Sequence, residues 1–81
     1  MKPIFLERED IRRLPEGSIV REHSLDSSGR PQYMDITVRH KGADVKFYFQ
    51  KYEGTYCETK LRAFKTDTYH YYELIQKGEQ L

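Results

Sequence analysis

The chain has 81 residues, of which 37% are hydrophobic, 33% charged and 14% aromatic, and this suits one small domain spanning residues 1–81. That length excludes a multidomain enzyme, and a single cysteine, Cys57, excludes an internal disulfide scaffold. The formal net charge of +1 lacks the strong basic excess that marks many nucleic-acid-binding domains, although a local basic patch is compatible with it.

The N-terminal segment predicts a short helix that ends near Leu14. Acidic residues at positions 7, 9 and 10 precede Arg12 and Arg13, an order that the helix dipole favours. Ile11 and Leu14 then share one apolar face, and the Pro-Glu-Gly sequence at 15–17 ends the helix. The acidic run also follows the first six residues directly, unlike a secretory signal, and no apolar run approaches the length of a membrane span.

A first strand is expected over Ser18–Leu25. Arg21, Glu22 and His23 leave neither of its faces apolar, which is typical of an edge strand whose charges discourage aberrant pairing. The following residues 26–32 are rich in Ser, Gly and Pro and predict the longest and most mobile loop. This loop carries Arg30, a candidate contact to a partner.

The clearest pattern is a hairpin that turns at Gly42-Ala43. Even positions from 34 to 38 and odd positions from 45 to 49 are apolar, with polar residues alternating between them, as expected when one sheet face is buried. A two-residue turn, with Gly42 supplying a positive φ, places Val38 opposite Phe47 and Ile36 opposite Phe49. A loop one residue longer would oppose core and solvent side chains, so the register is well specified.

A second hairpin is expected around Glu53-Gly54-Thr55. A three-residue loop would place Tyr52 opposite Tyr56, Phe47 opposite Leu61 and, one pair further on, position 45 opposite position 63, again matching apolar with apolar. Bulges are common at such glycine turns and would alter this register.

These two registers predict four rows of outward side chains across three strands. The rows are Arg39, Lys46 and Arg62; Thr37, Tyr48 and Lys60; Asp35, Gln50 and Glu58; and Tyr33, Tyr52 and Tyr56. One end is basic and the other aromatic. Ordinary cross-strand pairing could account for the tyrosines, whereas adjacent like charges require a counter-charge, from an external anion or from Asp44, Glu58 or the first strand.

The C-terminal segment predicts a helix that begins after Asp67 and ends near Lys77. Asp67 would cap its first turn, and Gly78 would follow its last turn in a left-handed conformation. The stripe formed by Thr68, Tyr71, Tyr72 and Ile75 would then cover the apolar face of the sheet.

Catalytic and metal-binding patterns are missing from the sequence. On the predicted register His40 and Cys57 lie about six residues apart along the strands, on the order of 20 Å, so they cannot form a nucleophilic pair. Asp35 and Glu58 would lie about 10 Å apart on an open face with no pocket to bind a sugar. No metal-ligand spacing is present, so we expect neither metal nor cofactor, and no enzyme.

These elements predict an α+β fold: a small two-layer domain with an antiparallel meander of three to four strands, a short N-terminal helix and a C-terminal helix packed on one sheet face. The expected function is a non-enzymatic, cytosolic protein-binding regulator or inhibitor that acts through the exposed Tyr- and Arg-rich face, without a membrane partner. The alternative partner is nucleic acid, with Tyr48 stacking on a base and basic residues holding phosphates. The candidate contacts are Tyr33, Tyr48, Tyr52, Tyr56, Arg39, Lys46, Lys60 and Arg62, with Arg30 on the loop.

Overall fold

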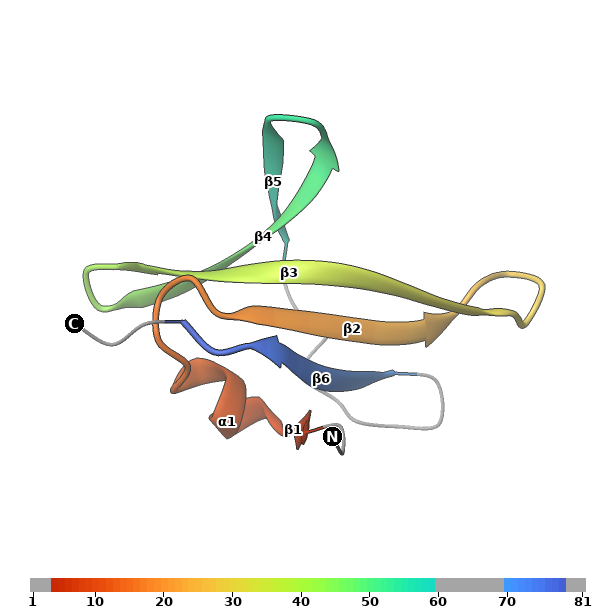
Figure 1. The fold of residues 1–81 in the computed structure, drawn as a ribbon, viewed down its shortest axis with the longest axis horizontal. Coiled ribbons are helices and arrows are strands. Elements are labelled where there is room, and N and C mark those ends of the chain that lie inside the picture. Colours follow the sequence, from red (N-terminus) through yellow and green to blue (C-terminus); the bar gives the residue numbers. More distant parts are fainter. Residues whose placement is uncertain (1–3, 60–69, 79–81) are drawn as a thin grey trace.

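The computed structural model describes residues 4–59 and 70–78, which form a six-stranded antiparallel sheet and one short helix (Figure 1). The elements are β1 (Ile4–Leu6), α1 (Arg8–Arg12), β2 (Ile19–Leu25), β3 (Pro31–Lys41), β4 (Asp44–Tyr52), β5 (Thr55–Thr59) and β6 (Tyr71–Gln76). Their order in the sheet is β1-β6-β2-β3-β4-β5. The predicted α+β class with a C-terminal helix was therefore wrong.

The C-terminal segment is a strand because its side chains alternate between the two faces of the sheet. Tyr72 is fully buried, whereas Tyr71 is 40% exposed on the opposite face. The strand β6 lies between β1 and β2, with Leu6 opposite Tyr72 on one side and Glu22 opposite it on the other. Both edges of β6 thus form hydrogen-bonded ladders, which a surface helix could not supply. The expected helix start at residues 67–69 lies outside the described residues.

Strand β2 lies in the centre of the sheet, whereas its charges predicted a position at an edge. It pairs with β6 on one side and with β3 on the other. Val20 is fully buried, but the next residue on the same face is Glu22, which is only 8% exposed. This buried carboxylate interrupts the apolar face and explains why the alternation was not visible in the sequence.

The hairpin of β3 and β4 has the register expected from the sequence. Val38 pairs with Phe47 and Ile36 with Phe49, and Lys41 closes the hairpin opposite Asp44. Gly42 adopts φ +61°, a left-handed conformation that residues with a side chain rarely adopt. The positive φ required of this turn is therefore present.

The predicted three-residue loop between β4 and β5 was wrong. Tyr52 pairs with Thr55, so the turn contains two residues, and a bulge follows between Gln50 and Tyr52. Because the bulge adds one residue to β4, its side chains point to the same faces of the sheet as predicted. The residues of β4 before the bulge, however, pair two positions earlier in β5 than predicted. Phe47 consequently pairs with Thr59 and not with Leu61, which lies outside the described residues.

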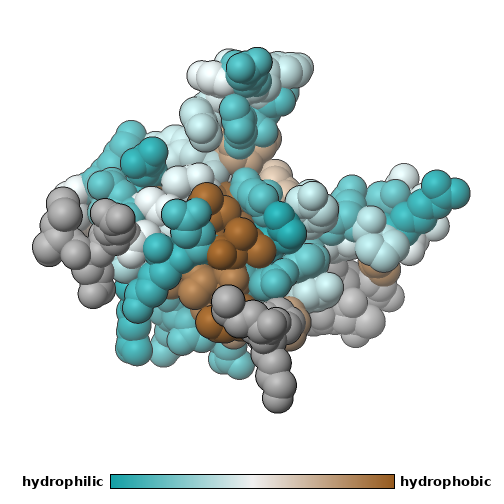
Figure 2. Space-filling model, viewed as in Figure 1, coloured by the Kyte–Doolittle hydropathy of each residue, from teal (hydrophilic) through white to brown (hydrophobic). Residues whose placement is uncertain are grey.

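The core lies between one face of the sheet and α1. Two side chains from the N-terminal region, Ile11 and Leu14, pack against the sheet, as their spacing predicted. The buried apolar residues are Leu6, Ile11, Leu14, Val20, Ile36, Val38, Phe47 and Tyr72. On the face seen in Figure 2, hydrophobic residues gather over β2, β3 and β6. The tips of the β2–β3 and β4–β5 hairpins are hydrophilic. None of the helical structure within residues 4–59 and 70–78 is long and apolar enough to cross a membrane.

The loop between β2 and β3 is a tight, hydrogen-bonded turn. The Asp26 carboxylate accepts hydrogen bonds from the backbone amides of Ser28 and Arg30, each at 2.9 Å, and from the Ser28 hydroxyl at 2.8 Å. These bonds, with the one from Arg30 the largest cause, hold the pKa of Asp26 below its ordinary value. Strand β3 already begins at Pro31, so the loop is shorter than expected.

The β2–β3 hairpin and the β4–β5 hairpin separate at one end of the sheet. The ladder between β3 and β4 ends at the pair Ile36 and Phe49, after which, within residues 4–59 and 70–78, β3 pairs only with β2 and β4 only with β5. Figure 1 shows the tip of the β4–β5 hairpin projecting away from the rest of the sheet. This separation decides which outward side chains can act together.

Candidate functional site

The face of the sheet opposite the core carries a line of aromatic rings. Phe5, Tyr71, His23 and Tyr33 come from the four neighbouring strands β1, β6, β2 and β3, and we call them the aromatic row. The His23 and Tyr71 rings stack with their centroids 4.5 Å apart and an interplanar angle of 8°. Phe5 meets Tyr71 edge-on at 5.6 Å, and Tyr33 lies 6.3 Å from His23. The rings therefore form a continuous strip across four strands.

A line of charged residues supports the aromatic row. Arg21 donates two hydrogen bonds to Asp35, at 2.7 and 3.1 Å, and these bonds raise the pKa of Arg21. The guanidinium carbon also lies 4.1 Å from the centroid of the Tyr33 ring, within the range of a cation–π contact. On the other side, Nε2 of His23 lies 2.8 Å from a carboxylate oxygen of Glu73. These contacts hold the rings in defined orientations.

The aromatic row remains accessible despite these internal contacts. Phe5 and Tyr33 are 60% and 62% exposed, and Tyr71 is 40% exposed. Large exposed aromatic side chains held by their neighbours lose little conformational entropy when another molecule covers them. The aromatic row therefore has the physical properties of a binding surface.

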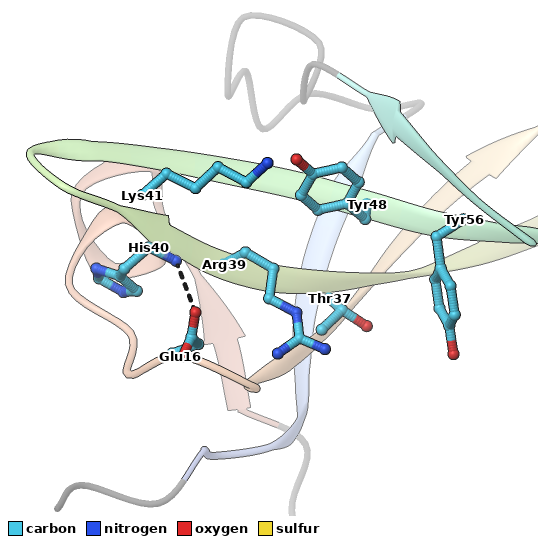
Figure 3. Close-up of a pocket in the computed structure, with 7 residues that line it drawn as sticks. All are labelled: Glu16, Thr37, Arg39, His40, Lys41, Tyr48 and Tyr56. Carbon is cyan, nitrogen blue, oxygen red and sulfur yellow. Dashed lines mark hydrogen bonds between the residues drawn. The ribbon is translucent and has the colours of Figure 1, made fainter.

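Further along the same face lies a second feature, which we call the basic hollow. It has a volume of about 390 Å³ and is lined by Glu16, Thr37, Arg39, His40, Lys41, Tyr48 and Tyr56 (Figure 3). The register places Thr37 and Tyr48 opposite each other on β3 and β4, whereas Glu16 comes from the turn after α1. With Tyr56 on β5, residues from four parts of the chain line it.

One wall of the basic hollow is fixed by hydrogen bonds to the turn after α1. The His40 backbone amide donates to a carboxylate oxygen of Glu16 at 3.3 Å, shown as a dashed line in Figure 3. The His40 ring bonds through Nε2 to the carbonyl oxygen of Leu14 at 2.8 Å. Since a carbonyl can only accept, Nε2 carries a proton in this contact.

The cations around the basic hollow differ in how far they are neutralised. The Lys46 ammonium lies 3.5 Å from a carboxylate oxygen of Glu58, which supplies the counter-charge that the predicted basic row required. Lys41 points toward the Tyr48 hydroxyl, and hydrogen bonding to Tyr48 is the largest cause of its raised pKa. Within residues 4–59 and 70–78, Arg39 makes no ion pair.

The structure does not bring the predicted aromatic end together. Tyr33 lies on the β2–β3 hairpin, whereas Tyr52 lies on the diverging β4–β5 hairpin. Tyr56 pairs with Gln50 and lines the basic hollow beside Tyr48. The predicted neighbours Arg39 and Lys46 do pair, and Arg30 lies on the exposed β2–β3 turn. Lys60 and Arg62 lie outside the described residues.

The aromatic row was missed because its members were not expected on neighbouring strands of one sheet face. Phe5 lies in a three-residue strand too short to predict, and Tyr71 was placed on a helix facing the core. His23 was expected on the first strand, but that strand was expected at an edge of the sheet. The available signal was the alternation of outward Tyr71 and Glu73 with inward Tyr72 and Leu74, which matches a strand.

The possible catalytic pairs are also rearranged. Cys57 pairs with Phe49 and His40 with Val45, so they lie four positions apart along β4, or about 13 Å and not 20 Å. Asp35 binds Arg21, while Glu58 faces Tyr48, so these carboxylates do not share a row. In the portion of the chain that the structure describes, no three His, Cys, Asp or Glu side chains gather to hold a metal ion.

Comparison with known proteins adds no assignment, because no protein family, curated protein or solved structure matches this chain. The geometry of the outer face is therefore the basis for a functional proposal.

Proposed function

We propose that this protein is a small, non-enzymatic module that binds another protein, as a regulator or inhibitor, through the aromatic row. The observation that supports this proposal most strongly is the ordered strip of Phe5, Tyr71, His23 and Tyr33. It is exposed across four strands and is fixed by ring and ion-pair contacts. Aromatic side chains supply much of the binding energy at protein interfaces because they bury large areas at low entropic cost.

The orientation of the rings favours a protein over a nucleic acid. Base stacking uses free ring faces, and one face each of His23, Tyr71 and Tyr33 is already occupied, by ring stacking or by Arg21. The row also carries the hydroxyl groups of Tyr33 and Tyr71, which can form hydrogen bonds with a protein surface.

The charges beside the aromatic row support the same choice. Glu73 and Asp35 flank Arg21, so this line has more acids than bases and would repel a phosphate backbone. A cytosolic location is part of the proposal, supported by the lone Cys57, which suits a reducing compartment.

The proposal is tested by capturing partners from a cell lysate, with and without nuclease, and measuring the affinity of the recovered protein. We expect Tyr33→Ala to weaken binding about 30-fold, the effect of losing a hot spot worth ~2 kcal/mol. Tyr52→Ala is the matched control, because Tyr52 is 67% exposed but lies on the other hairpin. Loss of capture after nuclease treatment, or equal effects of the two substitutions, would overturn the proposal.

A further inference from the structure

We infer that the basic hollow binds a carboxylate group carried by an acidic segment of the partner protein. The inference rests on the proposed function and adds the chemistry that the partner must carry. It starts from Arg39, whose side chain lines the hollow and forms no ion pair within the described ranges 4–59 and 70–78.

Arg39 offers the geometry that a carboxylate requires. A guanidinium group presents parallel N–H donors that match the two oxygens of a carboxylate. Arg21 makes such a two-bond contact with Asp35 on the same face of this sheet, at 2.7 and 3.1 Å. Among the described residues, no carboxylate forms an ion pair with Arg39, whose side chain lines the hollow (Figure 3).

The other lining residues complete a site for an anion. The Lys41 ammonium lies 5.4 Å from the centroid of the Tyr48 ring, which holds the second cation at the hollow. Thr37, Tyr48 and Tyr56 contribute hydroxyl groups, each able to donate a hydrogen bond. Two cations and three hydroxyl groups therefore line one concave site.

The net charge of the hollow indicates the class of anion. Among the described lining residues, Arg39 and Lys41 supply two positive charges and Glu16 one negative charge, which leaves a single positive charge in excess. A carboxylate carries one negative charge, whereas a phosphate monoester carries between 1.5 and 2 at about pH 7. The hollow is thus matched to a carboxylate, and Glu16 disfavours the more highly charged phosphate.

The distance to the aromatic row constrains the partner further. Arg39 and Tyr33 lie on the same face of β3, six positions apart, which is on the order of 20 Å. An extended segment that contacts both would carry an Asp or Glu about six residues from its apolar anchor. The two features together define a sequence pattern to look for in a captured partner.

The test uses a blocked peptide of four glutamates as the probe, added to the isotopically labelled protein and followed by NMR. We expect saturable shifts at Arg39, Lys41 and Tyr48 that weaken as salt is raised, because exposed charges are screened. Arg39→Ala should weaken peptide binding at least fivefold, and Arg39→Gln should do the same if truncation to alanine disturbs folding. Arg30→Ala is the control, because it removes an equal charge from the exposed β2–β3 turn.

The inference is overturned if the shifts spread over the whole surface, if Arg30→Ala weakens binding as much as Arg39→Ala, or if inorganic phosphate binds more tightly than the peptide. Tyr33→Ala should leave peptide binding unchanged. Its effect on partner capture therefore tests the proposed function separately, and a failure of one proposal can be distinguished from a failure of the other.

Discussion

Gly78 lies against the turn that connects α1 to β2. Its backbone amide donates to the Ser18 hydroxyl at 2.8 Å, and that hydroxyl donates to the carbonyl of Pro15 at 2.7 Å. A Cβ atom at position 78 would lie 2.1 Å from the carbonyl oxygen of Glu16. Glycine is required here by close backbone approach, and not by the helix end that the sequence suggested.

We therefore expect Gly78→Ala to lower the free energy of unfolding by roughly 1 to 3 kcal/mol, the usual cost of forcing atoms into a packed site. Urea denaturation would measure it. Gly29→Ala is the comparison, since position 29 has open space around it and its cost comes only from the positive φ of +82°. A Gly78→Ala protein as stable as the unmodified chain would show that the contact at Glu16 is not maintained in solution.

At the scale of elements, neighbouring tyrosines distinguish the strand β6 from the helix expected there. In a helix both Tyr71 and Tyr72 would face the core, whereas in β6 Tyr72 is fully buried and Tyr71 contributes to the outer face. We expect Tyr72→Ala to cost ~3 to 5 kcal/mol of unfolding free energy, as for other large buried side chains. Tyr71→Ala should cost about 1 kcal/mol or less, because surface aromatic pairs contribute little more. Equal losses in chemical denaturation would favour the helical alternative.

Strands with a regular alternation of apolar and polar residues were predicted with their register, whereas irregular strands were not. The β3–β4 hairpin was predicted with its register because apolar and polar residues alternate on both sides of Gly42. The β4–β5 register was missed because the bulge at position 51 adds a residue without any distinctive residue type. These short-range features are decided by turn geometry, which alternation alone does not specify.

The C-terminal strand was missed for a different reason. Tyr71, Tyr72 and Ile75 have helical spacing, so the segment satisfied both periods, and the tertiary contacts with β1 and β2 decide between them. The basic hollow was foreseen only in part. Arg39 and Tyr48 followed from the β3–β4 register, but Glu16 joins them through the turn after α1, which no local pattern predicts.

At the scale of the whole molecule, the separation of the hairpins predicts uneven stability. β2 has a paired strand on each side, whereas in the described part of the chain the tip around Tyr52 and Thr55 is paired only within its own hairpin. In native-state hydrogen exchange, we expect the amides of Val20 and Leu74 to be the slowest and those near Tyr52 to exchange faster by several orders of magnitude. Uniform protection would indicate that the hairpin tip is covered in solution.

The position of β6 between β1 and β2 also affects the order in which the sheet can assemble during synthesis. Ile4 pairs with Leu74, about 70 positions later in the chain, so a ribosome must translate as far as Leu74 before β1 has its neighbour. Until then, the nascent chain holds one side of β2 without its final strand, and loop closure over such a separation is slow. An N-terminal fragment ending before Tyr71 would consequently have an open sheet edge at which other chains could add.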